Sequence, residues 1–244
     1  MKPILIQGAE NSEINYLLNN LENKKEVDIG SFKFWTGEMA NYPVVVSKTK
    51  VGEINAAAST AIGIMNFEPK CIINQGTAGS HSREIHRGDI VVGKEYFGLT
   101  NIRTKPRGEG EGIEPDNWEL KAYQSEDDEK ISKKANSDLV DFVYNMKDEY
   151  SAGNIHVGTI GSGDIWNREI DRIDFLHKEH GTLCEEMETA GVYNTANSFG
   201  VPVVGVRIIS NNEILKEEYR PELATECQKF VEKNVRKIIS ILRC

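Results

Sequence analysis

Short runs of β-branched and other apolar residues alternate with helical stretches along most of the chain. Runs of this kind are typical of strands buried on both faces, and glycine or polar residues follow most of them. Strands alternating with helices predict a largely parallel sheet that is covered by helices on both faces, hence an α/β fold. The stretches are PILIQGA (3–9), SEINYLLNNLEN (12–23), YPVVVSKTKVG (42–52), EINAAASTAIGIMN (53–66), KCIINQGTAG (70–79), GDIVVGKEYF (88–97), HVGTIGSGD (156–164), GTLCEEME (181–188), TAGVYNTANSF (189–199), VPVVGVRIIS (201–210) and a final helix at about 221–242.

One segment, residues 101–134, departs from this alternation. Its glycines at 108, 110 and 112 alternate with glutamates, and an acidic run follows at 126–129. Such a segment buries too little apolar surface to order itself, so we expect a long excursion or lid over the fold. Because nothing else in the 244 residues resembles a hinge, residues 1–244 are predicted to form a single domain.

Charge and composition exclude several classes of function. The formal net charge is -9 and the isoelectric point is about 5.2, which argues against nucleic acid as a partner because polyanion binding needs basic surface. The N-terminus lacks the apolar run of a signal peptide, and no run reaches membrane-spanning length, so we expect no membrane partner and a cytoplasmic location. The four cysteines and five histidines show no metal-ligand spacing, and a small molecule is the expected partner.

Polar or glycine-rich segments follow six of the predicted strands. In open α/β sheets, ligands bind beyond the carboxyl ends of the strands, so these segments are predicted to converge on one pocket. The segments are residues 8–13, 50–52, 76–79, 162–166, 186–188 and 210–213.

Three of the carboxylates at these ends are candidates for binding or catalysis. Glu186 and Glu188 flank Met187 at a strand-to-helix junction, where they could accept hydrogen bonds from a ribose diol or simply stabilise the first turn of a helix. Glu13 follows the first strand, with Ser12 available as a cap for the next helix. By itself, Glu13 fits a solvated acid at a helix start better than a catalytic group.

Three further features fit a nucleoside but also have ordinary structural interpretations. The loop NQGTAGS (74–80) could offer backbone N–H groups to a ligand, although a single such loop is a weak signal. Trp166 in SGDIW could stack on a purine or lie at the edge of the core. Arg103, Lys105 and Arg107 could bind a 5'-anion or form a solvated loop face.

Taken together and in order, these motifs resemble the nucleoside phosphorylase/nucleosidase superfamily, and most of all its methylthioadenosine/S-adenosylhomocysteine nucleosidase branch. The resemblance spans some 200 residues and rests on order and spacing more than on any single motif. The motifs are GAENSEI, KVGEINAA, INQGTAGS, GDIVV, SGDIW, EMETAGVY and VPVVGVRIIS.

The resemblance implies a three-layer α/β/α sandwich with a mixed, partly closed central sheet, commonly assembled as a homodimer. It implies cleavage of a purine nucleoside at the N-glycosidic bond, without metal or organic cofactor. Glu13 then matches the glutamate that activates water, Glu188 binds the ribose hydroxyls, and Trp166 lies where an aromatic side chain stacks on the base. Our hypothesis adds Glu186 as a second group that binds the ribose hydroxyls. The remaining substrate-side positions are Thr77, Ala78, Gly79, Ile165 and Met187.

The attacking nucleophile is predicted to be water. A phosphorylase must hold a phosphate dianion, and in the family an arginine near the loop glycine helps to do so. Here Asn74 occupies that place, and Glu13 would repel phosphate but could deprotonate water. A purine nucleoside phosphorylase remains an alternative.

The sequence departs from the family at Asn211, where adenine-type nucleosidases have an aspartate that protonates purine N7. An amide can donate a hydrogen bond but cannot transfer a proton. Asn211 therefore favours a 6-oxopurine or a 7-deazapurine of the queuosine type as the base. Alternatives are a methylthioadenosine/S-adenosylhomocysteine nucleosidase that tolerates Asn211, an inactive nucleoside-binding protein, an introduced substitution that traps substrate, or Glu213 as the missing acid if the strand continues that far.

Overall fold

The computed structural model describes residues 1–100, 106–112 and 133–242. Within these residues, nine strands form one sheet in the order β2-β3-β4-β1-β5-β8-β7-β6-β9. The strands are β1 (Ile4–Gly8), β2 (Glu22–Ile29), β3 (Phe32–Met39), β4 (Tyr42–Lys48), β5 (Cys71–Ser80), β6 (Ile90–Gly98), β7 (Ile155–Ser162), β8 (Thr182–Glu186) and β9 (Val203–Asn211). The predicted excursion at 101–134 lies mostly outside the described residues.

The sheet is mixed and closes on itself over part of its width. β5 pairs in parallel with β1 and with β9, and antiparallel with β8, so the five strands β5, β8, β7, β6 and β9 form a ring. The side chain of Tyr193 ties this ring together from inside: its hydroxyl donates to the carbonyl of Gly93 and accepts from the N–H of Gly205, each at 2.7 Å. The expected mixed, partly closed sheet is confirmed.

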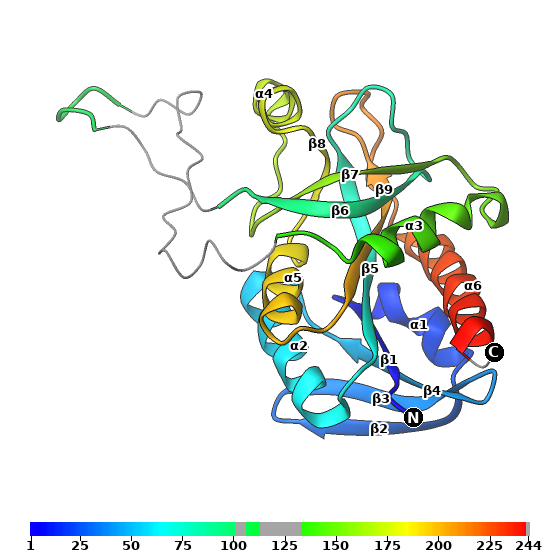
Figure 1. The fold of residues 1–244 in the computed structure, drawn as a ribbon. Coiled ribbons are helices and arrows are strands. Elements are labelled where there is room, and N and C mark those ends of the chain that lie inside the picture. The colour runs from blue at the N-terminus through cyan, green and yellow to red at the C-terminus, as the bar shows by residue number, and fades with distance from the viewer. Residues whose placement is uncertain (101–105, 113–132, 243–244) are drawn as a thin grey trace.

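Helices cover both faces of the sheet (Figure 1). They are α1 (Asn11–Asn19), α2 (Glu53–Phe67), α3 (Ser137–Asn145), α4 (Ile170–His180), α5 (Thr189–Ser198) and α6 (Ala224–Leu242), with 3-10 turns η3 (Lys147–Glu149) and η4 (Pro221–Leu223). The apolar sides of α1, α3 and α6 share one core cluster with the sheet, and those of α2 and α5 share another. The three-layer arrangement is therefore as expected.

The close approach of α2 and α5 depends on a glycine. A Cβ at Gly191 would lie 2.3 Å from the carbonyl oxygen of Glu53, well inside van der Waals contact. Without that side chain, α5 packs directly on the first turn of α2. This contact brings the segment before α5, which carries Glu186 and Glu188, next to the N-terminus of α2.

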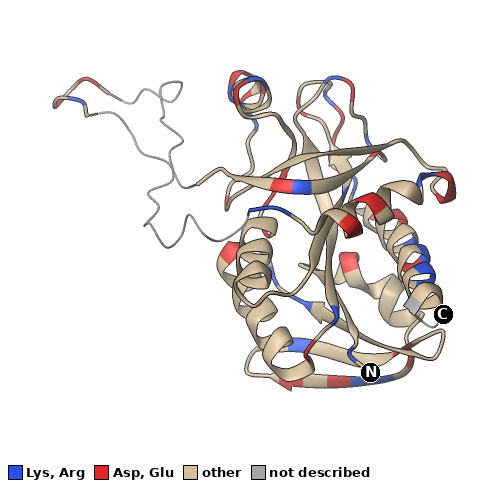
Figure 2. Ribbon diagram, viewed as in Figure 1, with Lys and Arg blue, Asp and Glu red and all other residues tan. Residues whose placement is uncertain are grey.

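The N-terminal third contains more strand than the sequence predicts. The helix expected at 12–23 ends at Asn19, and β2 begins at Glu22 and pairs antiparallel with β3. β2 has the sequence ENKKEVDI, whose residues are mostly exposed because it is an edge strand, so it lacks the apolar run of the inner strands. Acidic and basic residues are interspersed along it and along α6 (Figure 2).

Candidate active site

A cavity at the carboxyl ends of the ring strands is lined by residues from four separate parts of the sequence. They come from β5, the loop after β7, the junction between β8 and α5, and the end of β9 with the turn beyond it. The lining residues are Thr77, Ala78, Gly79, Ile165, Trp166, Glu185, Glu186, Met187, Glu188, Ser210, Asn211 and Tyr219. The structure thus brings together nearly all of the predicted substrate-side residues.

Glu13 lies in the first turn of α1 and is buried. It is not among the residues that line the cavity, and its carboxylate lies behind Thr77, which does line it. Its Oε2 accepts from the N–H of Ala9 at 2.8 Å and from that of Glu10 at 3.4 Å. Its Oε1 accepts from the N–H and the hydroxyl of Thr77, at 2.8 and 3.1 Å. Because Thr77 lines the cavity and its hydroxyl can rotate, Oε1 is the oxygen that a bound water could reach.

Glu13 faces a buried arginine across Gly76. A Cβ at Gly76 would lie 2.7 Å from Oε1 of Glu13 and 2.8 Å from Nη1 of Arg207, so only glycine leaves room for both groups. Arg207, on β9, is 1% exposed. Its Nη2 donates to Glu186 and to Asn74, and to the hydroxyl of Thr189 at 3.2 Å.

Three carboxyl groups therefore surround one cation, and we call Glu13, Glu186, Glu188 and Arg207 the arginine cluster. Burial opposes the charge of Arg207, but Glu186, Glu188 and Glu13 together outweigh it and raise the pKa of the guanidinium above its usual range. Carboxyl groups outnumber the cation, so this part of the site favours positive charge over negative charge.

Glu188 is the member of the cluster with the fewest hydrogen bonds. Its Oε1 accepts from the N–H of Gly52 at 3.1 Å, at the start of α2, and its Oε2 lies 3.9 Å from Arg207. Burial, and next the charge of Glu186, raise the pKa of Glu188 to about 8. Because Glu188 lines the cavity, its carboxyl group can form further hydrogen bonds with a ligand there.

Glu186 has a different environment from the one predicted. Besides Arg207, its carboxylate accepts from the N–H groups of Glu188 at 3.0 Å and of Thr189 at 2.9 and 3.1 Å. These bonds stabilise the N-terminus of α5 and occupy both oxygens. Of the two interpretations open for this pair, these hydrogen bonds fit the helix-start role for Glu186. Ribose binding by Glu186 and Glu188 stays a prediction.

At the other end of the cavity the side chains are aromatic or amide. Trp166 is half-exposed and meets Tyr219 edge to face, with ring centroids 5.6 Å apart. Asn211 is buried at the end of β9, where the hydroxyl of Ser210 donates to its Oδ1 at 3.1 Å. Its Nδ2 is directed along the face of Gly79, so an amide donor is available to a ligand there.

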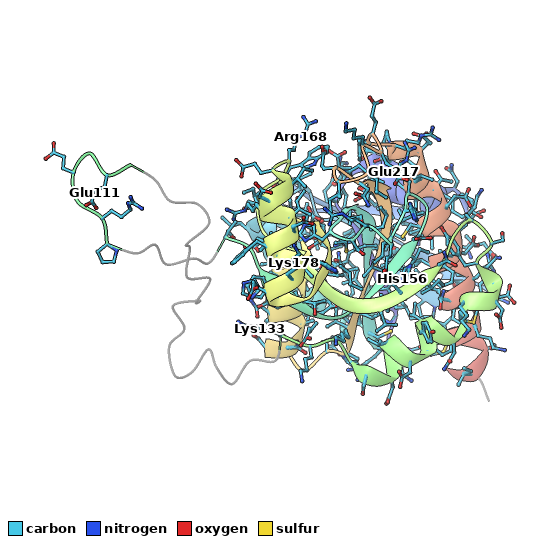
Figure 3. All side chains as sticks on the ribbon, turned by 90° about the horizontal axis from the view of Figure 1, so that it is seen from above. Glu111, Lys133, His156, Arg168, Lys178 and Glu217 are labelled. Carbon is cyan, nitrogen blue, oxygen red and sulfur yellow. The ribbon has the colours of Figure 1, made fainter. Side chains whose placement is uncertain are left out.

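Glu213 does not take up the position that would let it replace the missing acid. β9 ends at Asn211, and the chain turns at residues 213–216. The carboxylate of Glu213 is outside the cavity lining and lies 3.4 Å from Nε of Arg168. Figure 3 shows Arg168 at the edge of the molecule, near the end of α4.

The basic cluster cannot be assigned to the cavity. Arg103 and Lys105 lie outside the described residues. Arg107 is exposed and donates to the carbonyl of Glu111 at 2.8 Å, and Glu111 lies away from the body of the molecule in Figure 3.

Sequence reasoning missed two members of the site, Arg207 and Tyr219. Arg207 has a visible signal, because a charged residue inside the buried run VVGVRIIS must have buried partners. Tyr219 has none, because it belongs to an irregular segment beyond β9 that only the turn at 213–216 folds back on Thr77 and Trp166.

Several known proteins are similar to this chain in sequence or in fold. A 5'-methylthioadenosine/S-adenosylhomocysteine nucleosidase of an Exiguobacterium species is 31% identical over 217 residues, covering 85% of this chain and 84% of the relative. The solved structure of such a nucleosidase from Neisseria meningitidis, in complex with methylthio-immucillin-A, has a TM-score of 0.80 at 24% identity and covers 97% of this chain and 100% of that chain. The solved structure of the futalosine hydrolase of Helicobacter pylori has a TM-score of 0.80 at 22% identity, and the match covers 97% of this chain and 98% of that chain. A model of the phosphorylase superfamily matches residues 3–243, which confirms the resemblance, and the chain belongs to this superfamily.

Proposed function

We propose that the protein is a nucleoside hydrolase that cleaves the N-glycosidic bond of a purine-type nucleoside with water. The observation that carries this proposal is the position of Glu13. Its buried carboxylate accepts from the N–H and the hydroxyl of Thr77, which lines the cavity, and it faces Arg207 across Gly76.

The chemistry follows from the two ends of the cavity. The base stacks on Trp166, and Glu188 holds the ribose hydroxyls. As the glycosidic bond lengthens, positive charge develops on the sugar, and the carboxylates of the arginine cluster stabilise it. Glu13 accepts a proton from the water that attacks C1'.

The departing base leaves with the electron pair of the broken bond and takes a proton from solvent. Asn211 stabilises the base by a hydrogen bond and cannot supply that proton. Bases that leave without protonation at N7 therefore suit this site best, which supports a 6-oxopurine or a 7-deazapurine of the queuosine type. The alternative is 5'-methylthioadenosine or S-adenosylhomocysteine, the substrates named for the Exiguobacterium relative.

Charge supports water over phosphate as the nucleophile. Arg207 lies across Gly76 from Glu13, and its Nη2 already donates to Glu186, Asn74 and Thr189. A phosphate dianion there would face three carboxyl groups.

The test is release of free base from a panel of nucleosides, measured with and without added phosphate. We expect turnover that does not depend on phosphate and produces free ribose, with inosine, guanosine or queuosine preferred to methylthioadenosine. Dependence on phosphate with ribose 1-phosphate as product would support a phosphorylase. Purine binding without release of base from any nucleoside would support a binding protein.

We also propose that the protein is a homodimer, as the family resemblance implies. Ile54 and Met65, 81% and 72% exposed, stand eleven residues apart on α2 and so share one face, next to Val51. Pairing of two copies would cover these side chains. The expected result of sedimentation is a dimer that Ile54→Glu with Met65→Glu converts to monomer.

Location in the cytoplasm remains a prediction from the sequence. Among the helices that the structure describes, none is long and apolar enough to cross a membrane. Cell fractionation followed by antibody detection would test the location.

A further inference from the structure

Glu185 is a third buried carboxyl group that lines the cavity, besides Glu186 and Glu188, and it is not part of the arginine cluster. It precedes Glu186 on β8, and successive side chains of a strand point to opposite faces, so Glu185 is directed away from Arg207. Its hydrogen-bond partners are accordingly different from those of Glu186.

Two residues hold the Glu185 carboxylate through three N–H groups. Asn167, directly after Trp166, donates its backbone N–H to Oε1 at 2.6 Å and its side-chain amide to Oε2. His81, 1% exposed, contributes Nε2 at 3.0 Å from Oε2, and its Nδ1 lies 2.8 Å from the hydroxyl of Thr182.

These contacts leave one acceptor position of the Glu185 carboxylate open to a ligand. A carboxylate only accepts, so Nε2 of His81 carries the hydrogen of that bond. A carboxylate has about four lone-pair directions, and three are occupied here. The remaining one is on Oε1, in a side chain that lines the cavity.

Glu185 and Asn211 stand on the two sides of Gly79. Gly79 pairs with Glu185 across β5–β8 and with Asn211 across β5–β9. Two strand spacings of about 4.8 Å place the Cα atoms of Glu185 and Asn211 roughly 10 Å apart. Gly79 has no side chain to fill the space between them, and a Cβ there would lie 3.3 Å from Nδ2 of Asn211.

A ligand across Gly79 therefore meets an acceptor at one side and an amide at the other. A lactam purine, with a 6-oxo group and a hydrogen on N1, matches both: N1–H donates to a carboxylate, and O6 or N7 accepts from an amide. Adenine presents an unprotonated N1, whose lone pair a carboxylate repels, and the pairing is lost.

We propose that Glu185 is a specificity-determining residue that selects lactam purines by accepting a hydrogen bond from N1–H. This inference rests on the proposed nucleoside hydrolase function and narrows its substrate class. His81 and Asn167 are positioning residues, which keep the carboxylate in place and leave it as an acceptor only.

The first experiment uses the unaltered protein and compares kcat/KM for inosine, 1-methylinosine and adenosine. A hydrogen bond to a charged group predicts that inosine exceeds each of the other two by roughly 10- to 100-fold. Equal kcat/KM values for inosine, 1-methylinosine and adenosine would overturn the proposal and leave the hydrolase function intact.

The second experiment compares Glu185→Gln with the control Glu226→Gln, which alters an exposed ion pair to Lys229 on α6. We expect Glu185→Gln to lower the inosine-to-adenosine ratio of kcat/KM by roughly 10-fold or more, and Glu226→Gln to leave it unchanged. A structural role alone would lower kcat/KM for both nucleosides equally, which would count against the proposal.

Calorimetry with free bases separates failure of this inference from failure of the proposed function. If no nucleoside is cleaved, the hydrolase proposal fails, but hypoxanthine should still bind the unaltered protein roughly 10-fold or more tightly than adenine and 1-methylhypoxanthine. Equal affinity for the three bases would overturn the inference on Glu185.

Discussion

The two ends of the cavity stabilise their buried carboxyl groups in different ways. The arginine cluster gathers three carboxyl groups around one cation, so every member depends on Arg207. At the other end, which we call the amide end (His81, Asn167, Glu185 and Asn211), a single carboxylate accepts from one imidazole and from the backbone and side-chain amides of one asparagine.

This difference separates two consequences of substitution. Removing one charge from the arginine cluster leaves others buried without compensation, so stability and catalysis should change together. Substitution at the amide end changes which hydrogen bonds a base can form and should mainly alter recognition. The following predictions test that division.

The largest effect is expected from Glu13→Gln. An amide cannot accept the proton of the attacking water, so kcat for the best nucleoside of the panel should fall by about 10²–10⁴-fold. Steady-state kinetics would measure this, with Glu68→Gln, in an exposed ion pair to Lys2, as the control. Unchanged kcat in Glu13→Gln would remove Glu13 from the mechanism.

Arg207→Met should lower the free energy of unfolding by about 3–5 kcal/mol, because it leaves Glu186 without its buried counter-ion. Urea denaturation would measure the loss. The matched control is Arg236→Met, which breaks an ion pair to Glu232 on the outer side of α6 and should cost at most about 1 kcal/mol. Similar losses in both variants would contradict the description of the arginine cluster.

Asn211→Asp should raise kcat/KM for adenine nucleosides, since a carboxylic acid can protonate N7 of the leaving base. An increase of about 10²-fold is expected, the low end for general acid catalysis. Base release from methylthioadenosine and from inosine would be compared in the same assay. If methylthioadenosine is already the preferred substrate of the unaltered protein, the role given to Asn211 is wrong.

For a step of a single pH unit, the effect of pH through Glu188 is expected to be the smallest of these. Its folded pKa is raised from 4.5 to about 8, so the folded state binds this proton more tightly than the unfolded state. The resulting stability is fully present below pH 4.5 and is lost as pH rises toward about 8, at no more than about 1.4 kcal/mol per pH unit.

Urea denaturation of the unaltered protein and of Glu188→Gln at several pH values would isolate this contribution. The stability of the unaltered protein relative to the variant should decline between pH 5 and pH 8. A relative stability that increases with pH would show that Glu188 is held as a carboxylate in the folded protein.

Local sequence patterns predicted much of the fold. Apolar runs located β1, β4, β5 and β9, and the amphipathic C-terminal stretch located α6, because burial on a sheet imposes these compositions. β2 was missed because an exposed edge strand imposes no apolar run, and its first residues extend the helical pattern of α1.

For the candidate site, the sequence predicted which segments meet but not which side chains bind one another. Glycine and polar residues at strand ends indicated which segments meet, because the topology of an α/β sheet brings such ends together. The partners of individual side chains were not predictable: Glu185, Glu186 and Glu188 look equivalent in LCEEME, yet each has its own set of partners.

The sequence by itself determined the α/β fold, the segments that form the cavity and the amide at position 211. Tertiary structure decided which carboxyl group meets Arg207, which one meets the N–H of Gly52 and which one meets His81. The physical reason is that these contacts join residues far apart in the chain, such as Glu13 with Thr77 and Gly52 with Glu188. Their charge and hydrogen bonding depend on packing that local patterns do not encode.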